Sequence, residues 1–546
     1  MTDTPISTFG CLLDNAAKTW PERPAIIFPE GQQSFAELYE KAELRARQLI
    51  ALGVQPGEHV GILLTTGFEF VEVMFGIALA GAVMVPINAR YRSNEITYLT
   101  ENADLVTIVT TGKVAEGLNF VERLYEGLPG VADAAAPRGL AIEVAPKLRN
   151  ILLLGGDEAK GTVSEADTLA DARAVAAADI AARRDSVVGD DIAMILYTSG
   201  TTSNPKGCLL SGASLIQNGR ALADVYEMTG DDSFWSPLPM FHIAATFPLA
   251  ACFDIGSAYI TMSYFEAEAA LKLLESTKAT ITYPCFITII SDMVNHPYFE
   301  QADLSHARVM NISPGLQPPA LIAKIEEKMP DCIMVGTFGL SEASGTVTSH
   351  KLSDPREIRH GRLGGPMPGQ EVRIIDPETG EEAPALSHGE ILVRGPNILK
   401  GYYKDPIKTA EAIDADGWLH TGDTGSVDEN NQIMFHGRIK DMLKVGGENV
   451  AAVEIESLLQ EHEAVKLAQI VSAPHERLVE VPAAYIELED GGSATEEELI
   501  AFCKGKISSF KIPRYVRFVT EWPMSTSKIQ KYKLRDDIAD ELAAAS

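Results

Sequence analysis

A run of hydroxyl side chains, glycines and one lysine has the composition of a phosphate-binding loop. It reads Tyr197-Thr198-Ser199-Gly200-Thr201-Thr202-Ser203-Asn204-Pro205-Lys206-Gly207 and follows residues 192–196, an apolar stretch that predicts a strand. Glycines let the backbone approach an anion, neighbouring N–H groups can form a concave nest, and the hydroxyls and Lys206 add donors and charge. The run therefore predicts a phosphate cradle. By composition alone an ordinary turn would look similar, and the spacing is not that of the GxxxxGK[ST] phosphate loop.

Strand-like and helix-like segments alternate along most of the chain around this run. This alternation predicts βαβ units and a buried parallel sheet. The predicted strands are residues 24–28, 59–64, 105–110, 150–154, 192–197, 280–283 and 332–336, and the predicted helices include 34–52 and 69–82. From about residue 370, short strands separated by turn signals predict a smaller β-rich subdomain. A last unit begins near Lys440, with a helix at 453–463, a strand pair at 464–471 and 483–488, and a basic end.

Two further stretches between these elements are rich in alanine or in larger apolar residues. Residues 170–182 are predicted to form one surface helix that connects two units. Residues 237–262 raise the question of a membrane span, but they contain three prolines, His242 and Asp254. That composition is poor for a lipid-facing helix, so the stretch predicts buried core around a pocket.

The overall charge restricts the partners that the protein can have. With 46 basic and 76 acidic residues the formal net charge is −30, which repels phosphate backbones and anionic membranes. We therefore expect no nucleic acid partner and no membrane span, and a polyphosphate would need a local positive site. The six cysteines are scattered without a CxxC pair, and no targeting segment is recognisable, which together favour the cytoplasm.

Several other motifs follow the cradle in a fixed order. They are Thr337-Phe338-Gly339-Leu340-Ser341-Glu342, the run from Gly389-Glu390 to Tyr402, Gly417-Trp418-Leu419-His420-Thr421-Gly422-Asp423, Gly437-Arg438-Ile439-Lys440-Asp441, Gly446-Gly447-Glu448-Asn449-Val450 and Ser527-Lys528-Ile529-Gln530-Lys531. With them the chain resembles, over nearly its whole length, the adenylate-forming superfamily in its acyl-CoA synthetase (AMP-dependent CoA ligase) branch. The resemblance implies an α/β fold. Residues 1–438 would form a large AMP-binding domain that includes the β-rich subdomain at about 370–438, and residues 439–546 a mobile α+β domain.

The resemblance also implies a reaction and the residues that carry it. A carboxylic acid would attack ATP to give acyl-AMP and pyrophosphate, and coenzyme A would then take the acyl group and release AMP. Lys528, Glu342 and His242 match catalytic positions of the family, and Glu342 and Thr198 match its Mg²⁺ site. The positions that match ATP or AMP contacts are Thr198, Ser199, Gly200, Thr201, Thr202, Lys206, Gly315, Thr337, Phe338, Gly339, Ser341, Asp423 and Arg438.

These residue types suit the roles that the resemblance gives them. A lysine is a compact positive charge for the carboxylate and α-phosphate that meet in the first step. A glutamate is a hard ligand for Mg²⁺, and an ionised aspartate such as Asp423 can accept both ribose hydroxyls. Three of the matched residues have a plainer interpretation when they are taken alone. Lys528 would be a surface lysine of the C-terminal tail, and His242 would be a core histidine. Phe338, which matches the ring that stacks on adenine in the family, would be a core aromatic residue.

For the second step, family members rotate the C-terminal domain. Lys440 matches the hinge position, where a residue must absorb a large change in φ and ψ. The positions that match the coenzyme A path are Gly446, Gly447, Glu448, Lys511 and Arg514. The chain departs from the family pattern at Ser527, where glycine usually precedes the catalytic lysine, and at Leu478-Val479, where Trp-Gly is usual.

The acyl pocket is expected at His242, Ala244 and Gly336, with further small residues nearby. These small side chains favour a medium-chain, alicyclic or aromatic acid over acetate. Two other functions stay open: transfer of the acyl group to a carrier protein on a separate chain or to an amine, and a non-catalytic nucleotide-binding descendant. A homodimer is an open alternative for the assembly.

Overall fold

The computed structural model describes residues 6–114, 117–198, 205–314, 317–377, 379–445, 448–475, 477–525 and 528–545. Within these ranges only the backbone is described for Lys440, Lys444, Glu448, Asn449, Ser525, Lys528 and Ala545. The predicted site residues outside the described ranges are Ser199, Gly200, Thr201, Thr202, Gly315, Gly446 and Gly447.

A seven-stranded sheet in the described part of the chain carries the start of the predicted phosphate cradle. Its strands, in spatial order, are β7 (Val163–Ser164), β6 (Asn150–Gly156), β5 (Leu105–Gly112), β3 (His59–Leu63), β4 (Val83–Pro86), β8 (Ile192–Thr198) and β9 (Lys206–Ser211). Neighbouring strands are parallel except β8 and β9, which are antiparallel. The helices of this part are α1 (Phe9–Thr19), α2 (Phe35–Ala51), α3 (Phe68–Leu79), α4 (Ser93–Asn102), α5 (Phe120–Gly127), α6 (Glu165–Ala174) and α7 (Ala177–Ser186).

A second sheet of seven described strands lies beside the first. Its order is β14 (Ile333–Val335), β13 (Val309–Asn311), β12 (Ile281–Thr282), β10 (Ser233–Trp235), β11 (Ala258–Ile260), β1 (Pro24–Phe28) and β2 (Gly31–Ser34). All pairs are parallel except β1 with β2. Its helices are α10 (Ala267–Thr277), α11 (Ile287–Asn295), α12 (Pro319–Lys328) and α13 (Arg356–Arg359).

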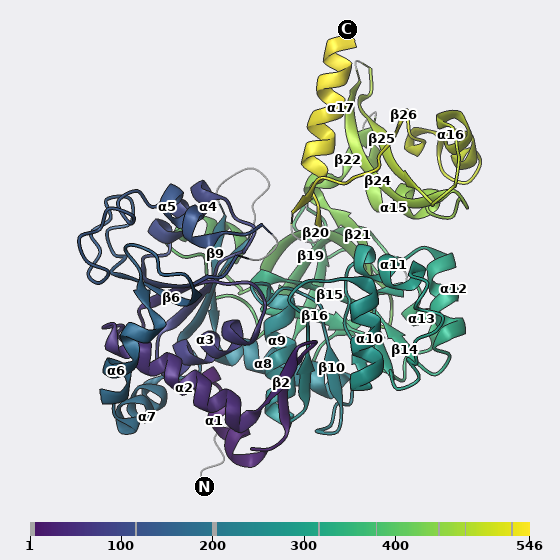
Figure 1. Cartoon of the computed structure of the whole chain (residues 1–546). Helices are drawn as coiled ribbons and strands as arrows, with labels where there is room; N and C mark the ends of the chain where they lie inside the picture. The colour runs from purple at the N-terminus through teal and green to yellow at the C-terminus, as the bar shows by residue number, and fades with distance from the viewer. Residues whose placement is uncertain are drawn as a thin grey trace.

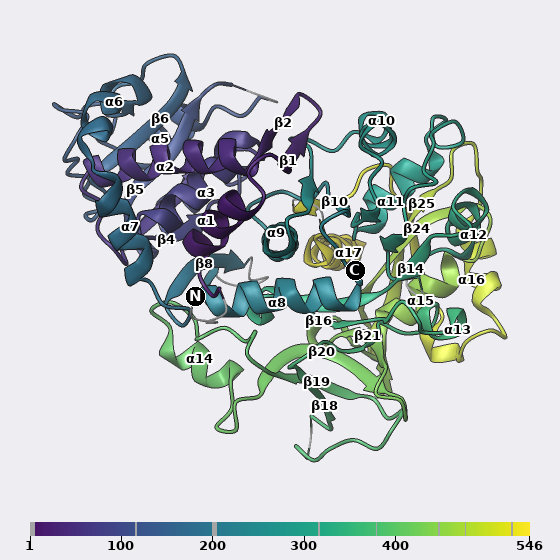
Figure 2. The ribbon, with the colours of Figure 1, turned by 90° about the horizontal axis from the view of Figure 1, so that it is seen from below.

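Helices α8 (Gly212–Val225) and α9 (Ile243–Ile255) lie between the two sheets (Figure 2). Helix α8 packs on β8 and β9, helix α9 packs on β10 and β11, and the two helices pack against each other. One hydrophobic core joins both sheets through them, so side chains at the ends of different strands are held in fixed relation.

The β-rich subdomain follows as two smaller sheets. One contains β15 (Thr337–Leu340), β16 (Gly345–Ser349) and β17 (Gly365–Pro366), with the short helix η2 (Ser341–Ala343) between the first two strands. The other is antiparallel and contains β18 (Glu371–Ile375), β19 (Gly389–Arg394), β20 (Leu419–Val427) and β21 (Ile433–Arg438), with α14 (Pro406–Ala412) between β19 and β20. The two sheets share a small hydrophobic core.

The C-terminal part has cores of its own and lies above β20 and β21 in Figure 1. After η3 (Ile439–Asp441) come β22 (Leu443–Val445), β23 (Glu448–Val450), α15 (Ala452–Leu459), β24 (Val465–His475), β25 (Val479–Leu488), α16 (Glu496–Cys503), η4 (Ser509–Lys511), β26 (Tyr515–Phe518), β27 (Met524–Ser525), β28 (Lys528–Ile529) and α17 (Lys531–Ala545). Strands β22 to β26 form one sheet, and β27 pairs with β28. The boundary at residues 438 and 439 stays a prediction.

The predicted α/β fold class with its β subdomain is confirmed. Each predicted strand of the parallel sheets is present, with ends that differ by at most two residues. The single helix predicted at 170–182 is wrong, because α6 ends at Ala174 and α7 begins at Ala177. Arg47 of α2 donates a hydrogen bond to the Val175 carbonyl at this break. The stretch 237–262 folds as α9 and β11, and no helix of the described residues has the length and apolarity to cross a membrane.

Candidate active site

The β8–β9 hairpin places two predicted ligand-binding side chains opposite each other. Thr198 ends β8, Lys206 begins β9, and the two residues are partners in the antiparallel register. The hairpin lies at the carboxyl end of β8, the edge of a parallel sheet where ligands bind in open α/β folds. Cys208, two residues beyond Lys206, is fully buried. Burial raises the pKa of its thiol well above the usual range, and the nearby Glu342 adds to the shift.

Glu342 lies on η2, a single turn whose backbone is anchored from two sides. The Ala343 carbonyl accepts hydrogen bonds from the side-chain amides of Asn218 (3.1 Å) and Asn397 (2.8 Å), both of which are buried. The Glu342 carbonyl accepts one from the Leu399 amide at 2.8 Å. The turn is therefore fixed by α8 and by the segment that follows β19, and these contacts hold the backbone from which the Glu342 side chain extends.

Residues 397–403, which we call the clasp, continue from this anchor to the β8–β9 hairpin. The Lys400 amide donates to Leu209 (2.8 Å), the Leu209 amide donates to Gly401 (2.9 Å), and the Tyr403 amide donates to Gly207 (2.8 Å). Cys208 and Tyr402 are paired in an antiparallel bridge. The clasp thereby joins two parts of the predicted site, the β9 strand and the Glu342 turn, that are far apart in the sequence.

Tyr402 of the clasp contacts both charged side chains of this site. Its hydroxyl donates to Glu342 Oε1 at 3.1 Å, and the Lys206 ammonium lies 4.4 Å from the centre of its ring. Burial raises the pKa of the Tyr402 hydroxyl, and the Glu342 carboxylate raises it further. The phenol is therefore a neutral donor over the whole physiological range.

Asp423 and Arg438 face each other on the neighbouring strands β20 and β21. They are register partners, and Arg438 Nε lies 3.2 Å from Asp423 Oδ1. The aspartate side chain is 5% exposed and the arginine side chain 47% exposed. A buried carboxylate beside an exposed guanidinium can accept ligand hydroxyls while the arginine reaches outward.

Phe338 and the residues around it occupy β15 and its ends. The Phe338 side chain is 6% exposed in the core of the β-rich subdomain, with its ring centre 6.1 Å from that of Phe435, so its adenine contact stays a prediction. Thr337 accepts a hydrogen bond from Asn311 at 3.2 Å. A Cβ at Gly339 would lie 2.3 Å from the Gly345 carbonyl, so the β15–β16 bulge itself requires a glycine there. Ser341 begins η2, one residue before Glu342.

The residues predicted for the acyl side lie at the start of α9 and between β14 and β15. His242 precedes the first turn of α9, where its ring is 4.8 Å from that of Phe241, and Ala244 follows in that turn. The Gly336 amide donates to Nδ1 of the buried His350 at 2.9 Å. A Cβ at Gly345 would lie 2.4 Å from the Phe247 ring of α9, so a glycine here lets the strand after Glu342 approach that helix.

The predicted residues of the C-terminal part fall into two groups. The backbones of Lys528, Lys440 and Glu448 lie in β28, η3 and β23, which leaves their side-chain roles as predictions. Lys511 of η4 is paired with Glu454 of α15, with its ammonium 2.7 Å from both carboxylate oxygens. Arg514 is exposed, and its amide donates to the Pro482 carbonyl at 2.8 Å.

Sequence reasoning missed the side chains that organise the Glu342 turn. Asn397 and Tyr402 lie inside a motif run that was recognised, but their residue types gave no chemical reason to single them out. Asn218 lies in α8 and outside every motif. Only the fold shows that these three side chains meet at η2.

Comparisons with known proteins agree with this geometry. The pattern of the AMP-binding enzyme family matches residues 13–403, and that of the AMP-binding enzyme C-terminal domain matches residues 454–528. The mitochondrial medium-chain acyl-CoA ligase ACSF2 of Rattus norvegicus is 31% identical to this chain over 546 residues. The match covers 98% of this chain and 88% of the rat protein. The 3-[(3aS,4S,7aS)-7a-methyl-1,5-dioxo-octahydro-1H-inden-4-yl]propanoyl:CoA ligase of Rhodococcus jostii (strain RHA1) is 31% identical to this chain over 543 residues. The match covers 98% of this chain and 100% of that ligase.

A solved structure resembles the whole chain as well. The anthranilate CoA ligase AuaEII in complex with anthranoyl-AMP matches with a TM-score of 0.84 and 25% identity, covering 100% of this chain and 99% of that one. The chain belongs to the AMP-binding enzyme family, and so to the adenylate-forming superfamily in its acyl-CoA synthetase branch. Its enzyme class is that of a carboxylic acid–CoA ligase, which confirms the reaction class expected from the motifs.

Proposed function

We propose that this ligase activates a medium-chain or cyclic carboxylic acid, with Lys206 and Glu342 holding the polyphosphate end of ATP and Asp423 holding its ribose. The observation that carries the proposal is the joining of Thr198, Lys206 and Glu342 by the clasp at the carboxyl edge of the first sheet. At this edge the Lys206 ammonium offers a positive charge to a polyphosphate, and the Glu342 carboxylate offers a negative charge to its metal counter-ion.

In the first half-reaction the substrate carboxylate oxygen bonds to the α-phosphorus of ATP. The bond from that phosphorus to the bridging oxygen breaks, and pyrophosphate leaves with the electron pair. Lys206 would offset charge on the departing phosphates, and Lys528 would bridge the carboxylate and the α-phosphate. His242, at the start of α9, would border the acyl carboxylate.

In the second half-reaction the sulfur of coenzyme A attacks the acyl carbonyl, and AMP leaves. We propose that the C-terminal part turns about Lys440 between the two steps and brings residues 446–448 to the site. Lys511 would then exchange Glu454 for a phosphate of coenzyme A, since its ammonium lies against both oxygens of that carboxylate.

A magnesium ion fits the residues at Glu342. One carboxylate oxygen accepts a hydrogen bond from Tyr402, and the other has no hydrogen-bond partner among the described residues. A hard carboxylate oxygen together with phosphate oxygens is the ligand set that Mg²⁺ prefers, and the bound ion would neutralise phosphate charge. Thr198, at the neighbouring strand end, would add a hydroxyl.

The substrate class follows from the small side chains on the acyl side and from the relatives. Ala244 keeps the first turn of α9 small next to His242, whereas Gly336 is needed for packing, since a Cβ there would come within 3.2 Å of the Arg362 carbonyl. One relative is named for medium-chain acids and another for a bicyclic propanoate. Both favour an acid larger than acetate.

Pyrophosphate release across a panel of carboxylic acids, with Mg-ATP and with or without coenzyme A, tests this proposal. We expect turnover that requires coenzyme A, yields AMP and a thioester, and is faster with medium-chain or cyclic acids than with acetate. Highest kcat/KM for acetate would contradict the substrate class. Pyrophosphate exchange without thioester would move the assignment to a carrier protein or an amine as acceptor.

A further inference from the structure

The Tyr402 side chain contacts both Lys206 and Glu342. Its hydroxyl meets the carboxylate at 3.1 Å and its ring meets the ammonium at 4.4 Å. The side chain is 7% exposed, so its position is set by the protein rather than by solvent. Two functional groups of opposite charge are therefore oriented by a single residue that carries neither charge.

The backbone of Tyr402 is as firmly held as its side chain. Its amide donates to Thr409 Oγ1 at 2.9 Å, and its bridge to Cys208 ties it to the β9 strand two residues from Lys206. On the other side the clasp holds the Glu342 turn through Leu399. Movement of the ring relative to either charged group would require part of the clasp to open.

Lys206 and Glu342 do not pair with each other. Both are among the described residues, and no ion pair within 4.0 Å joins them. A direct pair would neutralise the groups that the phosphates and their counter-ion need. With the ring against the ammonium and the hydroxyl on one carboxylate oxygen, each group is held while its charge stays available to a ligand.

We propose that Tyr402 is a positioning residue for the Mg-ATP site: its hydroxyl orients the Glu342 carboxylate and its ring orients the Lys206 ammonium. This inference rests on the proposed roles of Glu342 and Lys206. The two halves of the side chain act on different ligands, since the hydroxyl serves the counter-ion and the ring serves the phosphates.

Two substitutions separate these halves, and the neighbouring tyrosine supplies a matched control. Tyr402→Phe keeps the ring and removes the hydroxyl, whereas Tyr402→Leu removes both. Tyr403 is adjacent, and its hydroxyl donates to Asp104 at 2.8 Å, away from both charged groups, so Tyr403→Phe removes a comparable hydrogen bond elsewhere.

Calorimetric titration with ATP, once with Mg²⁺ and once with a chelator, reads out the two effects, and thermal unfolding monitors folding. We expect Tyr402→Phe to weaken Mg-ATP binding about tenfold, the size typical of a hydrogen bond to a charged group, and to leave metal-free ATP binding unchanged. Tyr402→Leu should weaken both forms. Tyr403→Phe should match the wild type in both titrations.

Three results would overturn the inference. They are unchanged Mg-ATP affinity in Tyr402→Phe, an equal loss in both titrations for that variant, and a loss in Tyr403→Phe as large as in Tyr402→Phe. Failure of the proposed function looks different. A wild-type protein that binds Mg-ATP but forms no thioester with any acid would refute the ligase and would leave these titrations able to judge Tyr402.

Discussion

Val479 adopts a backbone conformation that suits its side chain poorly. Its φ is 69°, in the left-handed region, and its side chain is 72% exposed at the start of β25. A β-branched residue in this region is strained, and the exposed side chain gains little packing in return. The position is the one where the family usually has glycine, so the departure from the motif has a direct conformational cost.

Replacing this valine with glycine should therefore stabilise the C-terminal part. We expect Val479→Gly to add on the order of 0.5–1 kcal/mol, because relief of left-handed strain exceeds the entropy that glycine adds to the unfolded chain. A higher midpoint temperature of thermal unfolding would show this. Val481→Gly, at a buried position two residues away, should lower the midpoint instead. A lower midpoint for Val479→Gly would show that its conformation is not strained.

His350 makes stability depend on pH. It is fully buried, and burial, helped by the nearby Arg359, lowers the pKa of its imidazole to about 4. Between that value and about pH 6.5, where a free histidine titrates, the unfolded chain binds a proton that the folded chain does not. Stability should thus fall as the pH is lowered through this window, by up to about 3 kcal/mol from this residue.

The difference between wild type and His350→Asn isolates this contribution, since the asparagine oxygen can still accept from the Gly336 amide. Between about pH 7 and about pH 5 the midpoint temperature of the wild type should fall further than that of the variant. Equal falls would mean that His350 titrates normally in the folded protein. His436, whose pKa burial and the stacked His388 also lower to about 4, titrates in both proteins and cancels in the comparison.

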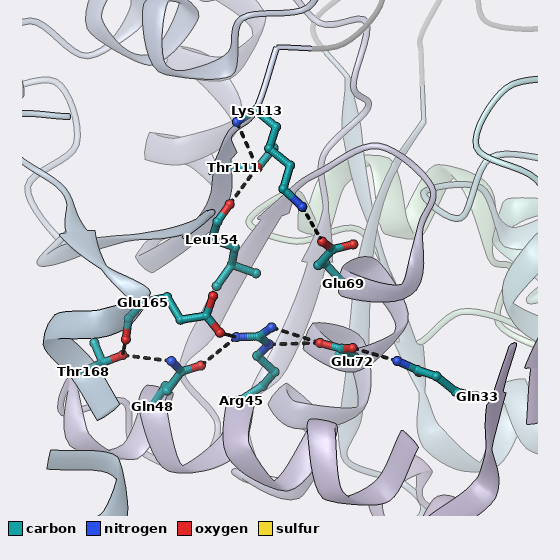
Figure 3. A network of polar contacts seen from close by, with 10 residues as sticks. All are labelled: Gln33, Arg45, Gln48, Glu69, Glu72, Thr111, Lys113, Leu154, Glu165 and Thr168. Atoms are coloured by element: carbon teal, nitrogen blue, oxygen red, sulfur yellow. Dashed lines mark hydrogen bonds and ion pairs between the residues drawn. The ribbon is translucent and has the colours of Figure 1, made fainter. Parts of the chain in front are cut away.

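At the scale of elements, a buried ionic network fastens helices α2, α3 and α6 together (Figure 3). Arg45 of α2 lies 2.9 Å from Glu72 of α3 and 2.5 Å from Glu165 of α6, and Gln48 bonds Thr168 at 2.8 Å. The close approach of α2 and α3 also needs Gly76, because a Cβ there would lie 2.4 Å from that of Arg45. The network joins the helices that cover the sheet carrying the β8–β9 hairpin.

Removing the cation from this network should be costly. Arg45→Met leaves the Glu72 carboxylate, which is 6% exposed, without its cation, and we expect a loss of about 3–5 kcal/mol. The double variant Arg45→Met/Glu72→Leu should recover much of it. As a control, Lys113→Met breaks the exposed pair with Glu69 in the same region and should cost less than about 1 kcal/mol. Chemical denaturation monitored by fluorescence gives the free energy of unfolding of all three variants. Equal losses for Arg45→Met and Lys113→Met would show that the buried network adds no more stability than an exposed ion pair.

The secondary structure and the site residues could be predicted from the sequence to different extents. The buried strands β3, β5 and β6 were evident as short runs of valine, isoleucine and leucine, because a sheet covered on both faces must be apolar throughout. The break between α6 and α7 was not, since Arg47 acts there from another helix. The charged site residues follow from motifs, whereas Asn218, Asn397 and Tyr402 owe their roles to tertiary contacts that no local pattern encodes.

At the scale of the whole molecule, several basic residues of the C-terminal end are paired with acidic neighbours in the same part of the chain. Lys511 pairs with Glu454, Lys531 with the buried Glu456, and Arg535 with Asp441 of η3. Helix α17 is thus tied both to α15 and to the segment that holds the proposed hinge. These pairs join α15, α17 and η3 within the C-terminal part, an arrangement that suits the proposed rotation of this part as one unit.

Lys528→Ala tests whether the two half-reactions use different placements of this part. We expect adenylate formation to fall by about a hundredfold or more, because a charge at the α-phosphate is lost, while thiolation of supplied acyl-AMP continues. The exposed Lys533→Ala should leave both unchanged. Equal loss of both half-reactions in Lys528→Ala would contradict the two-placement account.

The clasp has a consequence for the time at which the enzyme becomes competent during its synthesis. Chains emerge from the ribosome in order, and the hairpin of residues 192–211 is complete long before residues 397–403 appear. Contacts between segments so distant in sequence form late in folding. A nascent chain therefore lacks the clasp contacts, and with them the proposed polyphosphate site, until most of the protein has been made.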